Sequence, residues 1–243
     1  NPEALNHTPG SPLLINLWAS WCGPCSEELT QLTAHEQALR KRGLQIIALS
    51  VDGLGDEGVA GRAAAARLLE KLKFPYESAF ATPQLVANLE LVASCLIDKH
   101  NRLPVPSSFL IDAEGRVAVI YKGLLSVDQL LADLSRLDLR KESLRDHAAH
   151  FPGRWFLDPP IANPSPIIRG MATSGRTHEA EAYLSQWATP EVSESYYYLA
   201  NVYRQEGDLS DAVTAYKKAL ESRSPPPQSH QELGVVLSQL KNF

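Results

Sequence analysis

The sequence predicts an α/β domain with a mixed central sheet flanked by helices, followed by an all-α segment of helical repeats. Short apolar runs alternate with amphipathic helical patterns over roughly the first 140 residues. Prolines then cluster, and beyond them a helical pattern repeats at a spacing of about 34 residues. We therefore expect a domain over residues 1–139, a Pro-rich linker over 140–166 and helical repeats over 167–243.

The first half of the predicted domain reads strand, helix, strand, helix, which is typical of a parallel sheet covered by helices. Residues 13–18 form an apolar run of buried-strand length. The helix over 22–42 ends there because three cations fill its last turn and Gly43 follows, as the helix dipole and a left-handed cap favour. Residues 44–51 are the second predicted strand and residues 59–73 the second helix.

The second half of the predicted domain ends in an antiparallel hairpin. A helix over 82–97 starts at Thr-Pro, which supplies a hydroxyl cap and a proline at the first helical position. Two strand-like runs within 107–121 flank Ala-Glu-Gly at 113–115, a hairpin signal. Ser126 and Gln129 form a capping box for the last helix. The sheet should therefore begin parallel and finish antiparallel.

After the linker, small and aromatic residues recur at helix-turn-helix spacing: Tyr196, Leu199, Ala200, Tyr203, Gly207, Ala212, Tyr216, Ala219 and Leu220. This segment resembles tetratricopeptide repeats, with one full copy near 193–226, a degenerate copy before it and half a copy after it. We expect the array to continue beyond residue 243, because stacked repeats need neighbours to bury their faces. Such arrays bind peptides or helices, so the resemblance implies a bound protein partner.

Composition excludes several classes of protein. With 23 basic and 28 acidic residues the net charge is -5, which gives no electrostatic footprint for nucleic acid or an anionic membrane surface. The chain has no apolar run long enough to span a bilayer, and three cysteines are too few for a disulfide-stapled scaffold. We expect a soluble globular protein. Because the first residue is Asn, the chain is either processed, as after signal-peptide removal, or an excised piece.

The chemistry is concentrated in Cys22-Gly23-Pro24-Cys25, at the junction of a predicted strand and helix. A structural zinc site needs four ligands, and the one other cysteine is Cys95, so we expect no metal. Two cysteines that merely pack are the other alternative. At a helix N-terminus, however, free N–H groups and the dipole stabilise a thiolate at Cys22. Cys25, one turn later, should be more buried and act as the resolving thiol, so no cofactor beyond this redox-active pair is needed.

Together with Trp18-Ala19-Ser20-Trp21 and the preceding Leu14-Ile15-Asn16, this motif resembles the thioredoxin fold. More narrowly, residues 8–137 resemble the exported or membrane-anchored bacterial thiol-disulfide oxidoreductases typified by TlpA and ResA. Asn16 stands where other thioredoxins have a buried aspartate, and Glu28 matches the active-site glutamate of that branch. The stretch from Val105-Pro106 to Asp112 matches the one that carries the family's cis-proline.

The resemblance implies roles for further residues. Glu28 would accept the proton of Cys25 during resolution, whereas by itself it could be an ordinary exposed helix carboxylate. Pro106 would form a cis peptide bond opposite the dithiol, where a trans turn proline is the default, and its loop, with Val105, would offer backbone to a substrate peptide. Trp21, with Gly23 and Pro24, would line the peptide groove; surface packing is the alternative for Trp21.

The leading hypothesis is a thiol-disulfide oxidoreductase, in the reductase direction, whose repeats recruit a partner or client. The resemblance implies a protein disulfide or dithiol client, an upstream thiol electron donor and an extracytoplasmic bacterial location. A repeat scaffold with a redox-passive domain is the alternative from another class. A peroxide reductase is disfavoured, because its Pro-x-x-x-Thr/Ser-x-x-Cys setting is missing. Cys95 lies on an apolar helical face and is expected to be a core residue, with a second resolving thiol as the alternative.

Overall fold

A computed structural model of the 243-residue chain describes residues 8, 10–55, 58–97, 102–137, 165–185, 193–222 and 224–241, without the side chains of 95–97. The chain divides into two compact units, one within residues 1–90 and 100–159 and the other within 91–99 and 160–243. The predicted linker lies outside the described residues except for 165 and 166, which begin a helix. Its extended conformation therefore stays a prediction.

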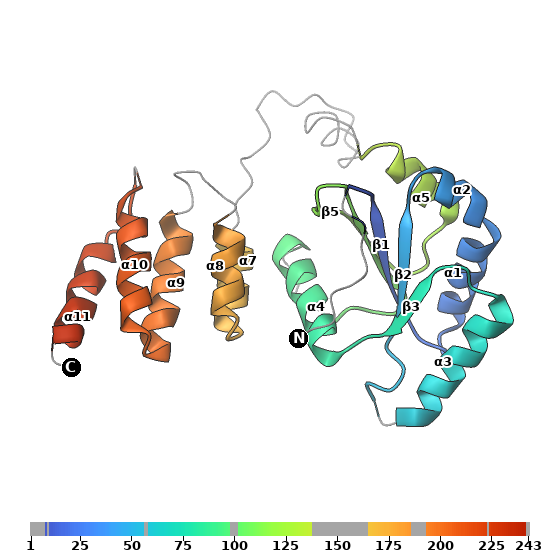
Figure 1. The fold of residues 1–243 in the computed structure, drawn as a ribbon, viewed down its shortest axis with the longest axis horizontal. Helices are drawn as coiled ribbons and strands as arrows, with labels where there is room; N and C mark the ends of the chain where they lie inside the picture. The colour runs from blue at the N-terminus through green and yellow to red at the C-terminus, as the bar shows by residue number, and fades with distance from the viewer. Residues whose placement is uncertain are drawn as a thin grey trace. The chain divides into compact units, whose positions relative to one another are not determined.

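The first unit is built on a five-stranded sheet in the order β3-β2-β1-β4-β5 (Figure 1). β1 pairs with β2 and β2 with β3 in parallel, whereas β4 pairs antiparallel with both β1 and β5. The expected change from parallel to antiparallel pairing is thus confirmed. The strands are β1 (Leu13–Trp18), β2 (Gln45–Ser50), β3 (Glu77–Phe80), β4 (Ser107–Ile111) and β5 (Val117–Lys122).

The helices of this unit agree with the predicted ones except at one break. They are α1 (Gly23–Ala34), α2 (Glu36–Lys41), α3 (Gly58–Leu72) and α5 (Val127–Leu134), together with α4 (Pro83–Ile97), of which residues 83–90 belong to this unit. The single helix expected up to Arg42 is wrong, because the backbone of His35 leaves the helical conformation at φ -105° and ψ 18°. The backbone N–H of His35 and its ring Nδ1 both lie within hydrogen-bond distance of the Gln31 carbonyl, at 3.1 and 2.9 Å, and a second helix starts at Glu36.

The sequence did not predict β3. This strand has four residues, all exposed, so it lacks the apolar alternation by which a half-buried strand is recognised. It is held by its backbone pairing with β2, from Ile47 opposite Glu77 to Ser50 opposite Phe80. It therefore extends the sheet at one edge.

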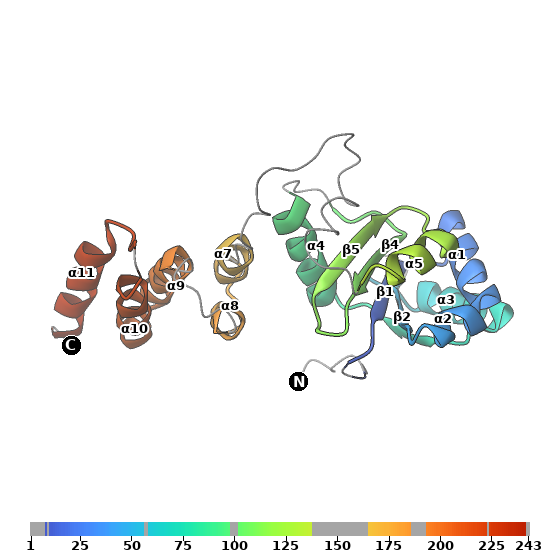
Figure 2. The same cartoon turned by 90° about the horizontal axis from the view of Figure 1, so that it is seen from above.

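The sheet buries side chains on both faces. Leu14, Asn16 and Trp18 of β1 share one face, and the α1 residues that pack toward it are Cys25, Glu28, Leu29 and Leu32. Helix α5 packs on the same face through residues that include Leu130. Figures 1 and 2 place α4 on the opposite side of the sheet. Cys22 and Cys25 thus lie at the start of α1, in one cluster with Trp18 of β1 and Ala48 of β2.

The second unit consists of antiparallel helices with one apolar core (Figure 2). The helices are α7 (Ser165–Thr173), α8 (Thr177–Leu184), α9 (Ser193–Glu206), α10 (Leu209–Leu220) and α11 (Ser229–Lys241). Leu199, Tyr203 and Tyr216 are fully buried, as the repeat pattern predicts. Gly207 turns the chain between α9 and α10 at φ 91°, a conformation that favours glycine.

Candidate active site

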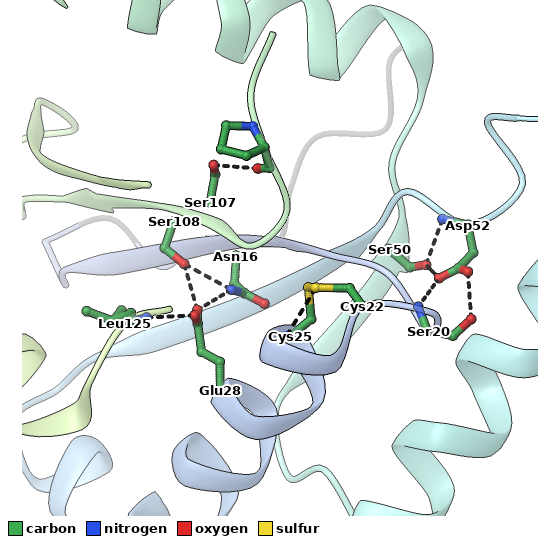
Figure 3. Close-up of a disulfide and its surroundings, with 11 residues drawn as sticks. Asn16, Ser20, Cys22, Cys25, Glu28, Ser50, Asp52, Ser107, Ser108 and Leu125 are labelled. Atoms are coloured by element: carbon green, nitrogen blue, oxygen red, sulfur yellow. Dashed lines mark hydrogen bonds between the residues drawn. A yellow bond between two sulfur atoms is a disulfide. The ribbon is translucent and has the colours of Figure 1, made fainter. Parts of the chain in front are cut away.

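The Cys22–Cys25 disulfide lies at the N-terminus of α1, with 5.2 Å between the Cα atoms (Figure 3). Cys22 is the N-cap residue, and its Sγ accepts a hydrogen bond from the backbone N–H of Cys25 at 3.2 Å. Pro24 occupies the first turn, where a missing N–H costs nothing. Cys22 is 7% exposed and Cys25 1%, the expected order of burial. When the bond is reduced, the same N–H and the helix dipole favour a thiolate on Cys22.

Glu28 is buried one turn after Cys25, and no cation is among its described hydrogen-bond partners. Its Oε1 accepts hydrogen bonds from Asn16 Nδ2 at 2.6 Å and Ser108 Oγ at 3.1 Å, and its Oε2 accepts one from the Leu125 N–H at 2.9 Å. Burial raises the pKa of Glu28 to about 7, and the Leu125 and Ser108 hydrogen bonds oppose this shift in part. The carboxyl group can therefore hold or release a proton near neutral pH. The reading of Glu28 as an exposed carboxylate is wrong, whereas the neighbouring Glu27 is exposed.

Three elements supply the groups around this carboxyl. Asn16 comes from β1, Ser108 from β4 and the Leu125 amide from the segment before α5. The Asn16 Nδ2 also donates to Ser108 Oγ at 2.9 Å. The register of β1 and β4 explains why these two side chains are in contact, because Asn16 and Ser108 are paired residues of the two strands. Of these three residues, Asn16 could be singled out from the sequence, whereas Ser108 and Leu125 were missed.

The Val105–Pro106 peptide bond is cis, which confirms the conformation expected from the family resemblance. Pro106 is buried, Val105 half-buried, and the next residue, Ser107, donates its hydroxyl to the Pro104 carbonyl at 2.6 Å. Around the disulfide, Trp21 is 62% exposed, and Gly23 and Pro24 are exposed as well. Trp21 is therefore accessible to a partner, and its place in a peptide groove stays a prediction beside the surface-packing alternative.

A second buried carboxylate, Asp52, holds the chain segment that leads into the dithiol. Asp52 accepts hydrogen bonds from the Ser20 N–H at 2.8 Å, the Ser20 hydroxyl at 2.7 Å and the Ser50 hydroxyl at 2.6 Å. It thereby ties the segment after β1 to the segment after β2 (Figure 3). Asp52 was not predicted from the sequence; its position directly after a buried strand was the available signal.

Within the described residues no three His, Cys, Asp or Glu side chains gather as a metal site would require. None of the described helices is long and apolar enough to cross a bilayer. Cys95 belongs to α4, but its side chain lies outside the described residues, so its role stays a prediction.

Comparison with known proteins agrees with this geometry. Residues 2–120 match the AhpC/TSA family and residues 193–223 the tetratricopeptide repeat. The first unit is a thioredoxin-fold domain of the AhpC/TSA kind. Together with the tetratricopeptide match over α9 and α10, this confirms both predicted resemblances.

Similar proteins are named thiol-disulfide oxidoreductases. The chain is 26% identical over 135 residues to ResA of Bacillus thuringiensis subsp. konkukian, a match that covers 53% of this chain and 64% of that protein. For ResA of Bacillus subtilis the identity is 22% over 122 residues, covering 50% and 59%. The chain thus spans less than two thirds of these relatives. A thiol:disulfide interchange protein from Chlorobium tepidum TLS is 22% identical, with a TM-score of 0.42 and coverage of 53% and 80%.

Proposed function

We propose that this protein is a thiol-disulfide oxidoreductase that reduces protein disulfides through Cys22 and Cys25. One observation carries the proposal: Cys22 caps the N-terminus of α1, and Cys25 lies in the first turn, one turn before the buried carboxyl group of Glu28. The Gly-Pro spacer supports the reducing direction, because thioredoxin, with its potential of about -270 mV, is a reductant. An upstream thiol donor would restore the dithiol after each turnover.

In the first step the Cys22 thiolate attacks one sulfur of the client disulfide. A bond forms between Cys22 Sγ and that sulfur, and the other client sulfur leaves as a thiolate that takes up a proton. Cys22 suits this role because it is the less buried sulfur and accepts the Cys25 N–H. Cys25 is almost fully buried, so an incoming disulfide reaches Cys22 first.

In the second step Cys25 resolves the mixed disulfide. Cys25 loses its proton to the Glu28 carboxylate, and its sulfur attacks Cys22 Sγ. The Cys22–Cys25 bond forms, the bond from Cys22 to the client breaks, and the second client sulfur leaves with the electron pair and takes up a proton. The client gains two electrons and the dithiol loses two. Glu28 suits the acceptor role because its pKa of about 7 lies far nearer to that of a thiol than an ordinary carboxyl does.

The client contacts would come from the surface around Cys22. Trp21 offers an exposed aromatic face, and Gly23 and Pro24 offer a surface without long side chains. Val105, at the cis bond to Pro106, would offer backbone hydrogen-bonding groups to an extended peptide. The tetratricopeptide segment would recruit the client or a partner and so raise its effective concentration at the dithiol. The relatives support an extracytoplasmic bacterial location.

The test is the reduction potential of the Cys22–Cys25 pair together with turnover of a protein disulfide such as that of insulin. We expect a reversible two-electron transition near -270 mV, the value for thioredoxin, and insulin reduction that Cys22→Ser abolishes. A potential near -120 mV, as in strong oxidants, would make the protein a disulfide donor. Inert cysteines would leave the repeat scaffold as the function. Peroxide consumption without a disulfide substrate would favour a peroxide reductase.

A further inference from the structure

The side-chain amide of Asn16 is partnered at one end only. Its nitrogen donates to Glu28 Oε1 and Ser108 Oγ, while its oxygen is buried and has no hydrogen-bond partner among the residues that the structure describes. Asn16 is 0% exposed, so bulk solvent does not reach this oxygen. Figure 3 shows the oxygen on the side of the amide that faces the disulfide, and the nitrogen toward Ser108 and Glu28. A buried acceptor without a donor therefore points at the redox centre.

The orientation of the amide follows from its partners. Turning it by 180° would place Oδ1 about where Nδ2 is now, 2.6 Å from a carboxylate oxygen. Two acceptors at that distance repel each other, so Nδ2 stays on Glu28 while the carboxyl group is ionised. The amide oxygen is thus held on the sulfur side by the same hydrogen bonds that satisfy Glu28.

A disulfide has no hydrogen to donate, whereas a thiol has one. The Asn16 oxygen consequently lacks a donor when Cys22 and Cys25 are bonded and gains one when the bond is reduced. We infer that Asn16 is a positioning residue of this redox reaction: in the dithiol state its Oδ1 accepts a hydrogen bond from the Cys25 thiol. The inference rests on the proposed redox function of the cysteine pair.

This hydrogen bond has two consequences. It stabilises the dithiol relative to the disulfide, and it also holds the Cys25 sulfur beside the amide whose other end binds Glu28, which keeps thiol and proton acceptor together. The nitrogen contacts of Asn16 are already present with the disulfide intact, so to first order they cancel in the redox equilibrium. The reduction potential thus isolates the oxygen's contribution from the structural role of the side chain.

The experiment measures the equilibrium with dithiothreitol for the full chain in a Cys95→Ser background. A net hydrogen bond of about 0.5–1.5 kcal/mol predicts that Asn16→Leu shifts the equilibrium toward the disulfide by about two- to tenfold, or about 10–30 mV more negative for a two-electron couple. Ser108→Ala is the matched control. The Ser108 hydroxyl bonds the Asn16 amide and the Glu28 carboxyl group, and its described hydrogen bonds do not include either cysteine sulfur. We expect Ser108→Ala to shift the potential by less than half as much.

An Asn16→Leu potential equal to that of the parent or of Ser108→Ala, or a less negative one, would overturn the inference. Infrared spectroscopy of a Cys22→Ser, Cys95→Ser chain keeps Asn16 in place and does not depend on the folding of the Leu variant. Its Cys25 S–H stretch should lie at the lowered frequency of a hydrogen-bonded thiol; a free-thiol frequency would overturn the inference. Loss of insulin reduction in the parent, with a normal potential, would instead refute only the proposed function.

Discussion

Replacing Glu28 by Gln should make the oxidised protein more stable at pH 8 and remove part of its pH dependence. The carboxyl group is buried and faces the Asn16 amide, the Ser108 hydroxyl and the Leu125 N–H, with Cys25 one turn away on the same helix. None of these groups carries a balancing positive charge. Ionised Glu28 is therefore a buried anion whose cost grows as the solution becomes more alkaline.

The magnitude follows from the raised pKa of Glu28, about 7 in the folded protein against 4.5 in the unfolded chain. A carboxyl group whose pKa is raised by folding binds its proton more tightly in the folded state, so its contribution is most favourable at low pH and is lost as the pH rises from 4.5 through 7. The loss is about 1 kcal/mol at pH 5 and about 3 kcal/mol at pH 8. Gln cannot ionise, so between pH 5 and pH 8 the free energy of unfolding of the variant should fall by about 2–3 kcal/mol less than that of the wild type.

The assay is urea unfolding of the oxidised chain at pH 5 and pH 8, followed by tryptophan fluorescence. The decisive quantity is the difference between wild type and Glu28→Gln at pH 8 minus the same difference at pH 5, because other titrating groups cancel in it. Glu27→Gln is the matched control, since Glu27 is the exposed neighbour on the same helix. If Glu28→Gln kept the full pH dependence of the wild type, the raised pKa of Glu28 and its role as proton acceptor would both be refuted.

Three further substitutions test the remaining parts of the structure. Cys25→Ser should trap the mixed disulfide with a client, seen as a higher-mass band on non-reducing gels; only free client after mixing would contradict the order of attack. Asp52→Ala removes the acceptor of three hydrogen bonds and should cost about 2–4 kcal/mol. Ser50→Ala removes one donor to this carboxylate and the acceptor of the Asp52 N–H, and should cost about 1–3 kcal/mol in the same urea titration. Leu199→Ala, in the core of the second unit, should lower its stability by about 2–5 kcal/mol and leave the reduction potential unchanged. Leu237→Ala, at a 39% exposed position, is the control for Leu199→Ala. A changed reduction potential in the Leu199→Ala variant would argue against the predicted division into domains.

Elements with strong local signals could be predicted from the sequence. The apolar run of β1, the Thr-Pro start of α4 and the serine cap of α5 each carry their own signal, and Ser126 does accept the Gln129 N–H. In the capping box, however, the Gln129 side chain bonds Asp133. β3 was missed because it is held by its pairing with β2 and has no apolar alternation of its own. The break at His35 was missed because no Gly or Pro in the sequence marks it.

In the candidate site, too, residues with a local sequence signal could be predicted and residues brought in from distant segments could not. The cysteine motif and Glu28 lie within one helix, so spacing alone places them on one face. Ser108 and the Leu125 amide meet Glu28 across separations of 80 and 97 residues, and nothing in their local sequence marks them. Ser108 becomes visible only when β1 and β4 are paired in their observed register. The Leu125 amide becomes visible only when the segment before α5 lies against Glu28 of α1.

The burial that destabilises ionised Glu28 is also what would make it useful. An ordinary carboxyl of pKa 4.5 and a free thiol of pKa about 8.5 differ by about 4 pKa units, so moving a proton from the thiol to that carboxylate would cost about 5 kcal/mol. With the pKa of Glu28 raised to about 7, the same transfer costs about 2 kcal/mol. The reduction in this cost is about equal to the stability that folding loses at pH 8. A stabilised Glu28→Gln variant should therefore resolve mixed disulfides more slowly, because the stability gain and the loss of the proton acceptor come from the same buried charge.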